Sequence, residues 1–329
     1  MKNPFRLIFV LVLGAFCLLR ATQDCAAAPE SGYPSKPIKL VVTFPPGGGA
    51  DVIARIIADG LAQRLGQPVL IDNRGGANGN IGMDFVAHAP ADGYTMVLTT
   101  VGTWAVNPSL YKASFDVVKD FAPIMQVTSS SGVLIVNPSL PVTNVKELIA
   151  LAKAKPGKLD YGSAGIGGFS HIAGVMFALM SGVELTHVPY KGAGPAVADA
   201  IAGQIPLLFN DALASLPYLK SQKLRGLAVT SIKRMPLLPE LPTVDESGVK
   251  GYDISSWTAM AAPAGTPKEI VDKLNREMTA VLEMPKTQEL IFAAGASIVG
   301  GTPERFADFL KAEIVKFRRV VQEGHITTE

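Results

Sequence analysis

The sequence has very little cysteine, and none at all after position 25. Its two cysteines are Cys17 and Cys25, and both precede Ala28, after which we expect the leader to be removed. A chain without cysteine has no disulfides, no thiolate metal ligands and no cysteine nucleophile. The stability of the mature protein must therefore come from its core.

The longest apolar run is shorter than a membrane-spanning helix, which makes an anchor the weaker interpretation. Lys2 and Arg6 precede the longest run, the 13 residues from Leu7 to Leu19, and small residues follow as far as Ala28. A membrane-spanning helix needs about 20 apolar residues. This layout is typical of a secretory signal, so we expect residues 1–28 to be a signal peptide cleaved near Ala28.

The mature chain also lacks an excess of charge. Of 30 basic and 28 acidic residues, Lys2, Arg6, Arg20 and Asp24 precede Ala28, which leaves 27 of each sign. No basic stripe remains that could follow a nucleic acid backbone, and we expect no nucleic-acid partner. The roughly 300 residues that remain favour two domains of ordinary size.

Residues typical of metal sites and catalysis are scarce as well. The four histidines, at positions 88, 171, 187 and 325, include no pair with the spacing HxH or HxxxH. The phosphate-binding pattern GxxxxGK[ST] is absent, and GxGxxG fails. The hydrolase pattern GxSxG fails because Ile172 stands where a glycine is required after Ser170. We expect no metal, no cofactor and no catalytic residue.

Strand and helix patterns alternate along the chain and predict an α/β fold. Apolar segments predict strands at 38–44, 69–71, 96–100, 159–162, 186–190, 206–209 and 224–230. The apolar segment 121–136 would carry the chain from one lobe to the other, and a return would follow near 257–262. We expect lobe 1 in residues 33–130, lobe 2 in 131–255, and a return to lobe 1 in 256–329.

Only helices are expected after the last of these strands. Thr266 and Glu269 have the spacing of a capping box at the start of the first helix, with Pro267 between them at the first helical position.

Three glycine-rich loops each lie between a predicted strand and a predicted helix: Pro45–Asp51, Ser163–Ser170 and Tyr190–Pro195. A helix N-terminus has unpaired N–H groups and a partial positive charge, so it favours a carboxylate or phosphate. If the two lobes face each other, these donors converge on a cleft. Two simpler interpretations remain: glycine also serves tight turns, and Asp51 would make a good helix cap.

Several segments together resemble the substrate-binding receptors of tripartite tricarboxylate transporters, also called Bug receptors. They are YPSKPIKLVVTFPPGGGAD, IDNRGGANGNIG, NPSLY with KDFAPI, YGSAGIGGFSH, HVPYKGAGPA and KLRGLAVTS. The resemblance implies a periplasmic, two-lobed α/β protein, in which each lobe is a sheet flanked by helices. Two crossover strands would join the lobes around a ligand cleft. It also implies a small carboxylate ligand and membrane permease subunits as partners, and we expect a monomer.

The resemblance also implies which residues bind the ligand. In the first lobe they are Pro46, Gly47, Gly48, Gly49, Asp51, Thr99 and Gly102. In the second lobe they are Ser163, Ala164, Gly165, Gly167, Ser170, Lys191, Gly192 and Asn210. Lys191 is the only cation in the three loops.

The chain departs from the family pattern at several places near this site. The usual triplet Phe-Asp-Asn reads Phe209, Asn210, Asp211, so its two polar residues are exchanged. Trp104 and Phe169 are bulky where something smaller or more polar is expected. They would either line a pocket for a flat acid or pack in the interior.

Two other functions stay open at this point. The chain could be an exported α/β serine hydrolase, with Ser163 or Ser170 as nucleophile and His187 as base. It could also be a ligand-sensing receptor that signals to a membrane partner without transport.

Overall fold

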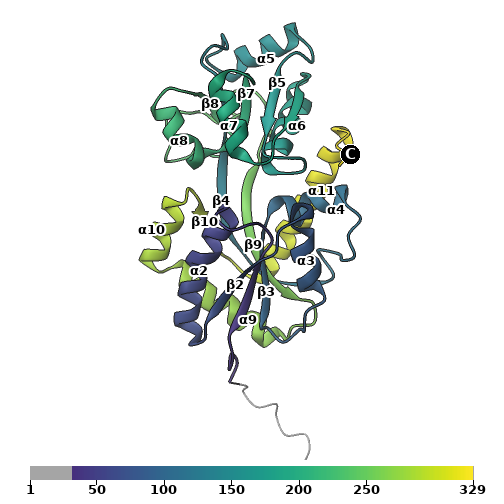
Figure 1. Ribbon diagram of the computed structural model, residues 1–329, viewed down its shortest axis with the longest axis vertical. Coiled ribbons are helices and arrows are strands. Elements are labelled where there is room, and N and C mark those ends of the chain that lie inside the picture. Colours follow the sequence, from purple (N-terminus) through teal and green to yellow (C-terminus); the bar gives the residue numbers. More distant parts are fainter. Residues whose placement is uncertain (1–31, 329) are drawn as a thin grey trace, which may run out of the picture. The chain divides into compact units, whose positions relative to one another are not determined.

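The computed structural model describes residues 32–328, and the predicted signal peptide lies outside them. The chain divides into Met1–Ser35 and Lys36–Glu329, and every described helix and strand lies in the second unit. Within that unit two lobes are visible, each with strands and flanking helices (Figure 1). Among the described helices, none combines the length and the apolar character that crossing a membrane requires.

The first lobe is built on three parallel strands. β1 (Ile38–Val42) lies between β2 (Val69–Asn73) and β3 (Thr95–Thr100). Its flanking helices and short turns are α2 (Gly49–Leu65), η1 (Ala77–Gly79), α3 (Asn80–Ala87), η2 (Gly102–Val106) and α4 (Asn107–Leu110). The apolar spacing of α2 buries Ile53, Ile57 and Leu61, and the helix ends at Gly66, whose φ of 66° suits glycine.

Two long antiparallel strands, β4 (Phe121–Val136) and β9 (Ser255–Pro263), connect the lobes (Figure 1). β9 pairs with β3 and with the first part of β4, whereas Gly132–Val136 of β4 pairs with strands of the second lobe. The prediction of two crossover strands is confirmed. The proposed lobe boundary near Ser130 falls inside β4.

The second lobe repeats the arrangement of the first. β5 (Asp160–Ser163) pairs in parallel with β6 (Thr186–Pro189) and with β7 (Leu207–Asp211), and β8 (Arg225–Val229) pairs with β4. The helices are α5 (Val145–Ala154), α6 (Phe169–Ser181), α7 (Ala193–Ala202) and α8 (Ala212–Lys220). Each of β5, β6 and β7 is followed by a helix, which puts the strand-to-helix loops at the same edge of the sheet.

The C-terminal segment contains α9 (Lys268–Leu282), α10 (Pro285–Ala293) and α11 (Pro303–Glu323). The expectation that only helices follow β9 is wrong, because β10 (Ser297–Ile298) pairs with Thr128 and Ser129 on β4. The prediction of a capping box is wrong as well. α9 begins at Lys268 without a side-chain cap, and the Thr266 hydroxyl donates instead to the carbonyl of Pro263 at 2.8 Å.

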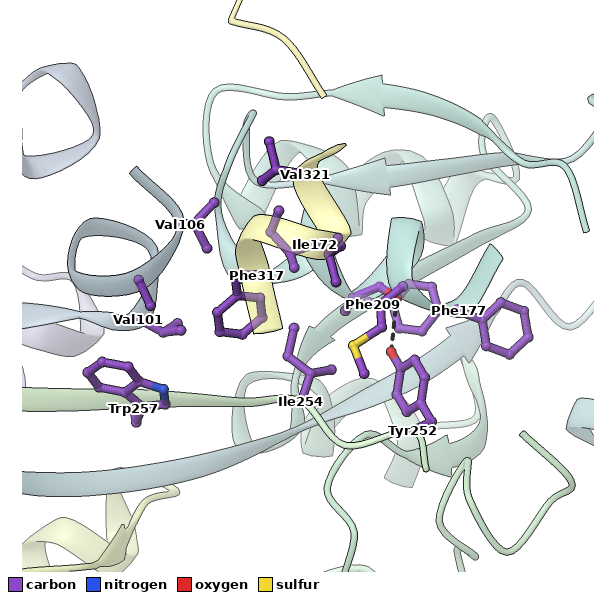
Figure 2. Close-up of a cluster of buried hydrophobic side chains, with 14 of the residues drawn as sticks. Val101, Val106, Ile172, Phe177, Phe209, Tyr252, Ile254, Trp257, Phe317 and Val321 are labelled. Atoms are coloured by element: carbon purple, nitrogen blue, oxygen red, sulfur yellow. Dashed lines mark hydrogen bonds between the residues drawn. The ribbon is translucent and has the colours of Figure 1, made fainter. Parts of the chain in front are cut away.

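One apolar cluster runs through both lobes along the crossover strands and α11 (Figure 2). Phe317 and Val321 of α11 belong to it together with Ile172 of α6, so the C-terminal helix contacts the second lobe as well as the first. Trp257 of β9 donates its indole N–H to the carboxylate of Glu313 on α11 at 2.9 Å. These contacts position both crossover strands against α11.

Candidate functional site

A cavity of about 560 Å³ lies between the two lobes. The first lobe and the return segment contribute Phe44, Pro45, Pro46, Gly48, Gly49, Ala50, Ile53, Asn78, Thr100, Val101, Gly102, Ala294 and Ala296. The crossover strands contribute Thr128, Ser130, Ser256, Trp257 and Thr258, and the second lobe contributes Ala164, Gly168, Phe169, Gly192 and Asp211. Of the residues predicted to bind ligand, the lining includes Pro46, Gly48, Gly49, Gly102, Ala164 and Gly192.

Three helix N-termini converge on this cavity. α2 follows Gly48, α6 follows Gly168 and α7 follows Gly192, and none of these glycines offers a side chain to cap its helix. The first bonds inside α2 and α6 run from Val52 N to Gly48 O and from Ile172 N to Gly168 O. The N–H groups that precede them have no partner within the helix. Because each terminus also carries a partial positive charge, the cavity favours an anion.

Glycine has a clear reason to stand before α7. Gly192 has φ 113° and ψ 170°, a backbone conformation that residues with a side chain rarely adopt. Its N–H donates to the carbonyl of Ala164 at 3.1 Å, which joins the second and third glycine-rich loops. The two second-lobe loops therefore present their helices to the cavity as one assembly.

The N–H groups of the loop after β5 are largely used within the protein. Ala164 N donates to Ser170 Oγ at 2.9 Å, Gly165 N to Ser163 Oγ at 3.2 Å, and Gly167 N to His171 Nδ1 at 3.0 Å. Ser163, Gly165, Gly167 and Ser170 do not line the cavity. These residues hold the shape of the loop, and the start of α6 faces the ligand space instead.

Behind that loop lies a cluster of Ser163, His171 and His187. Ser163 Oγ is 2.6 Å from His187 Nε2, and the two imidazole rings stack with centroids 3.8 Å apart. Burial lowers the pKa of His171 to about 3, with a further contribution from His187, and burial lowers the pKa of His187 to about 4. Both rings are neutral at pH 7. The pair named for a serine hydrolase is thus assembled, but Ser163 is 1% exposed and lies outside the cavity lining.

Asp51 holds the first glycine-rich loop in place through hydrogen bonds. It is the third residue of α2, so it is not the N-cap; its carboxylate reaches back to accept from Gly47 N at 2.9 Å. Arg55 donates to both carboxylate oxygens, at 2.9 and 3.0 Å, and Asn73 donates to one at 2.9 Å. The hydrogen bond from Arg55 is the main reason that the pKa of Asp51 falls to about 2. Asp51 is buried and fixes the loop without lining the cavity.

The remaining predicted residues also lie outside the lining. Thr99 is buried and hydrogen-bonds the hydroxyl of Thr43, and Asn210 is buried and donates to Ser215 Oγ at 3.0 Å. Lys191 is exposed and is absent from the cavity wall.

The two bulky residues have different places. Trp104 is fully buried and packs edge to face on Phe121 and Phe306, at centroid distances of 5.4 and 5.7 Å. It is therefore an interior packing residue. Phe169, the first residue of α6, lines the cavity.

The sequence prediction missed the cavity surface formed by the crossover strands. Thr128 and Thr258 share a hydrogen bond of 2.7 Å, and Ser130 is paired in register with Ser256. Both strands carry several hydroxyl residues, at 128–131 in β4 and at 255, 256 and 258 in β9, which was a usable signal for a polar surface. The pairing joins segments about 130 positions apart, however, and no local pattern gives that register.

The sequence prediction also missed Asp211. It ends β7, lines the cavity and accepts from Ser130 Oγ at 2.6 Å. Among the described residues that line this cavity it is the one with an ionisable side chain, and none of them is lysine or arginine. Within residues 32–328 no cluster of three or more His, Cys, Asp or Glu has the arrangement of a metal site.

Known proteins resemble this chain in both sequence and fold. A sequence model described as the tripartite tricarboxylate transporter family receptor matches residues 53–326. Protein BugT of Bordetella pertussis (strain Tohama I) is 38% identical over 301 residues, which cover 90% of this chain and 92% of BugT.

Two solved structures carry a dicarboxylate. R. palustris Rpa4515, determined with adipate, superimposes with a TM-score of 0.80 at 40% identity and covers 90% of this chain and 99% of its own. MatC (Rpa3494) from Rhodopseudomonas palustris, determined with bound malate, superimposes with a TM-score of 0.77 at 29% identity. It covers 88% of this chain and 100% of its own. The periplasmic binding protein BugD superimposes with a TM-score of 0.77 at 37% identity and covers 90% of this chain and 99% of its own, so the two-lobed fold of this chain is that of periplasmic binding proteins.

Proposed function

Because the chain belongs to the family of tripartite tricarboxylate transporter receptors, we propose that it captures a small carboxylated anion for a membrane permease. The observation that carries the proposal is the convergence of three uncapped helix N-termini, those of α2, α6 and α7, on one cavity. Their N–H groups and dipoles provide neutral donors for a carboxylate without a lysine or arginine in the wall.

The receptor works by lobe closure. Its two lobes are joined by β4 and β9, and the ligand stabilises the arrangement in which the donors of both lobes reach it. At the rim of the cavity the lobes already approach closely: a Cβ on Gly102 of the first lobe would lie 3.3 Å from the carbonyl oxygen of Gly167 in the second. Export by the leader, cleavage near Ala28, a periplasmic location and a monomeric state complete the proposal.

No covalent chemistry is part of this function. The Ser163–His187 pair supports the loop after β5, and neither residue lines the cavity. A hydrolase would need its nucleophile in contact with the bound substrate.

Ligand binding by the purified protein tests the proposal. The known complexes of relatives with adipate and malate make these two acids, together with benzoate as a flat acid, the first probes in a thermal-shift and calorimetric titration. A ligand that binds only the folded state raises the melting temperature. Absence of a shift with every carboxylate would overturn the proposal.

A variant then tests the site. A β-branched side chain at the N-cap of α2, Gly48→Val, should weaken binding by roughly tenfold, which corresponds to about 1.4 kcal/mol, since it occupies space in front of the N–H donors. Gly48 has φ −78° and the nearest atom to an added Cβ is 3.6 Å away, so the fold tolerates the change. Gln63→Val, in the exposed part of the same helix, is the control and should leave affinity unaltered.

Transport and sensing differ only in the membrane partner. The two functions are distinguished by measuring uptake of the labelled acid in cells with and without this protein. A transport receptor is required for uptake, whereas a sensor is not.

A further inference from the structure

Apolar side chains form the largest group in the wall of the cavity between the lobes. They come from both lobes and from the return segment, and they include Phe44, Ile53, Val101, Phe169, Ala294 and Ala296. Among the described residues that line this cavity, none is lysine or arginine. Beyond its carboxylate, a ligand that fills the cavity therefore meets mainly carbon.

Apolar side chains also lie next to the carboxylate donors themselves. Phe169 is the first residue of α6, so one residue supplies both an N–H at the helix start and an aromatic ring. On α2, Ala50 is the second residue and Ile53 follows about one turn later, and both line the cavity. A carboxylate bound at these helix starts thus has apolar groups of both lobes beside the carbon that carries it.

The ring of Phe169 is held in place by a residue that has no side chain. A Cβ on Gly132 of β4 would collide with the Cζ and Cε1 atoms of Phe169, so the edge of the ring lies directly against the strand backbone. Phe169 is half-buried and lines the cavity. Because close packing on β4 restricts the rotation of this side chain, it offers the ligand a fixed apolar surface.

Polar side chains of the same wall are largely bonded to one another. Thr128 and Thr258 share a hydrogen bond of 2.7 Å, and Ser130 donates to Asp211 at 2.6 Å. A carboxylate that loses its water without a cation or a full set of donors is destabilised. The wall therefore serves one carboxylate at the helix starts and offers nothing of equal strength to a second.

We propose that this receptor prefers a monocarboxylic acid with an uncharged, apolar body, and that Phe169 selects this class. The carboxylate meets the helix N-termini, and the apolar body contacts Phe169 of the second lobe and Ile53 of the first. This inference rests on the proposed function and narrows its substrate class. The preferred ligand differs from adipate and malate, the dicarboxylates found in the two solved relatives.

Two matched pairs of acids test this by titration calorimetry of the purified protein. The pairs are hexanoate with adipate and benzoate with terephthalate, and in each pair the second acid has one more carboxylate. We expect the monoacid of at least one pair to bind roughly ten- to a hundredfold more tightly, since a second carboxylate would lose its water without gaining a cation. If the diacid binds as tightly as the monoacid, or more tightly, in both pairs, the inference is overturned.

Two substitutions of Phe169 test its part in this choice, and both leave the backbone N–H at the start of α6. Phe169→Ser removes the apolar surface and should weaken binding of the preferred monoacid by roughly tenfold, with a smaller loss for its diacid partner. Phe169→Leu keeps an apolar side chain and should retain most of the preference. Equal losses for monoacid and diacid in Phe169→Ser would also overturn the inference. The comparison of acids in the wild type decides independently of how well either variant folds.

Phe292→Ser is the matched control. It makes the same substitution at an exposed position of α10 outside this cavity, and the affinities for all four acids should be unaltered. The two proposals fail differently. If no acid of either kind binds, the receptor function itself fails, whereas binding without a preference for the monoacid leaves that function intact.

Discussion

Ser163 Oγ lies 2.6 Å from His187 Nε2, inside a second-lobe cluster where His187 stacks on His171. Ser163 also accepts from the backbone N–H of Gly165 at 3.2 Å. The pair therefore links β5 and β6 to the loop that leads into α6. It holds the shape of that loop.

The first prediction concerns the absence of catalysis by this pair. The purified protein should not hydrolyse 4-nitrophenyl acetate above the rate in buffer, and Ser163→Ala should behave identically, because a serine that is 1% exposed does not reach a bound ester. Saturable turnover that is lost in Ser163→Ala would show instead that the hydrolase interpretation is correct.

The second prediction concerns stability against pH. In an unfolded chain the pKa of histidine is near 6.5, whereas in the fold burial lowers the pKa of His171 to about 3 and of His187 to about 4. Below pH 6.5 the unfolded chain thus binds more protons than the native one. The stability from the two neutral rings is fully present above pH 6.5 and is lost as the pH falls toward 4.

Urea unfolding at pH 7 and pH 4.5 measures this effect. The midpoint should be lower at pH 4.5, and His187→Gln, which cannot titrate, should reduce the difference between the two pH values. The exposed His88→Gln is the control and should retain the wild-type difference. Equal pH dependence in wild type and His187→Gln would contradict the prediction.

The third prediction concerns the support of the first glycine-rich loop. Asp51→Asn removes the charge that Arg55 contacts and weakens the bond to Gly47 N. We expect a loss of about 1–3 kcal/mol in the free energy of unfolding, the range for a buried charge-assisted hydrogen bond. Ligand affinity should fall as well, since the Pro45–Gly49 segment loses its anchor.

Asp59→Asn is the matched control for Asp51→Asn. It makes the same substitution at an exposed position of α2 and should change neither stability nor affinity. Equal unfolding midpoints for the two variants would show that Asp51 does not hold the loop.

The fourth prediction concerns the close packing of α6 on β5. A Cβ on Gly174 would collide with the ring of Tyr161, which is buried and lies with its centroid 5.0 Å from that of His187. Gly174→Ala should cost about 1–3 kcal/mol of stability, as overpacking does, although alanine is the better helix former. In α7, an added Cβ on Gly194 meets nothing within 4 Å, so Gly194→Ala should stabilise the fold by up to about 1 kcal/mol. Differential scanning calorimetry of both variants compares their melting temperatures with that of the wild type. A higher melting temperature for Gly174→Ala would contradict the prediction.

Local patterns in the sequence were sufficient to predict most of the strands and helices of the fold. Alternation of apolar runs with helical spacing predicted the strands and helices of both lobes, since each element depends on neighbours within a few positions. The two crossover strands were visible as apolar segments. β10 was missed because two residues that pair with a strand about 170 positions away have no periodicity.

The sequence predicted only the backbone part of the candidate site, namely the glycines that precede the helices. Glycines before α2 and α7 were recognised by sequence because a strand-to-helix turn in front of an open N-terminus is a local arrangement. The donors of Ala164, Gly165 and Gly167 were also expected to face the ligand, but they are bonded to Ser170, Ser163 and His171 within the loop. Whether an N–H is used internally depends on side-chain orientation, which the order of residues does not give.

The sequence by itself therefore determined an α/β chain with glycine-rich helix starts and, after Ala28, a neutral segment without cysteine. These follow from composition and from short-range stereochemistry. Only the tertiary structure decided which polar groups share the cavity, because Thr128, Ser130, Ser256 and Asp211 meet through strand pairing between distant segments. It also decided that Asp211 lines that wall while Asn210 and Lys191 do not.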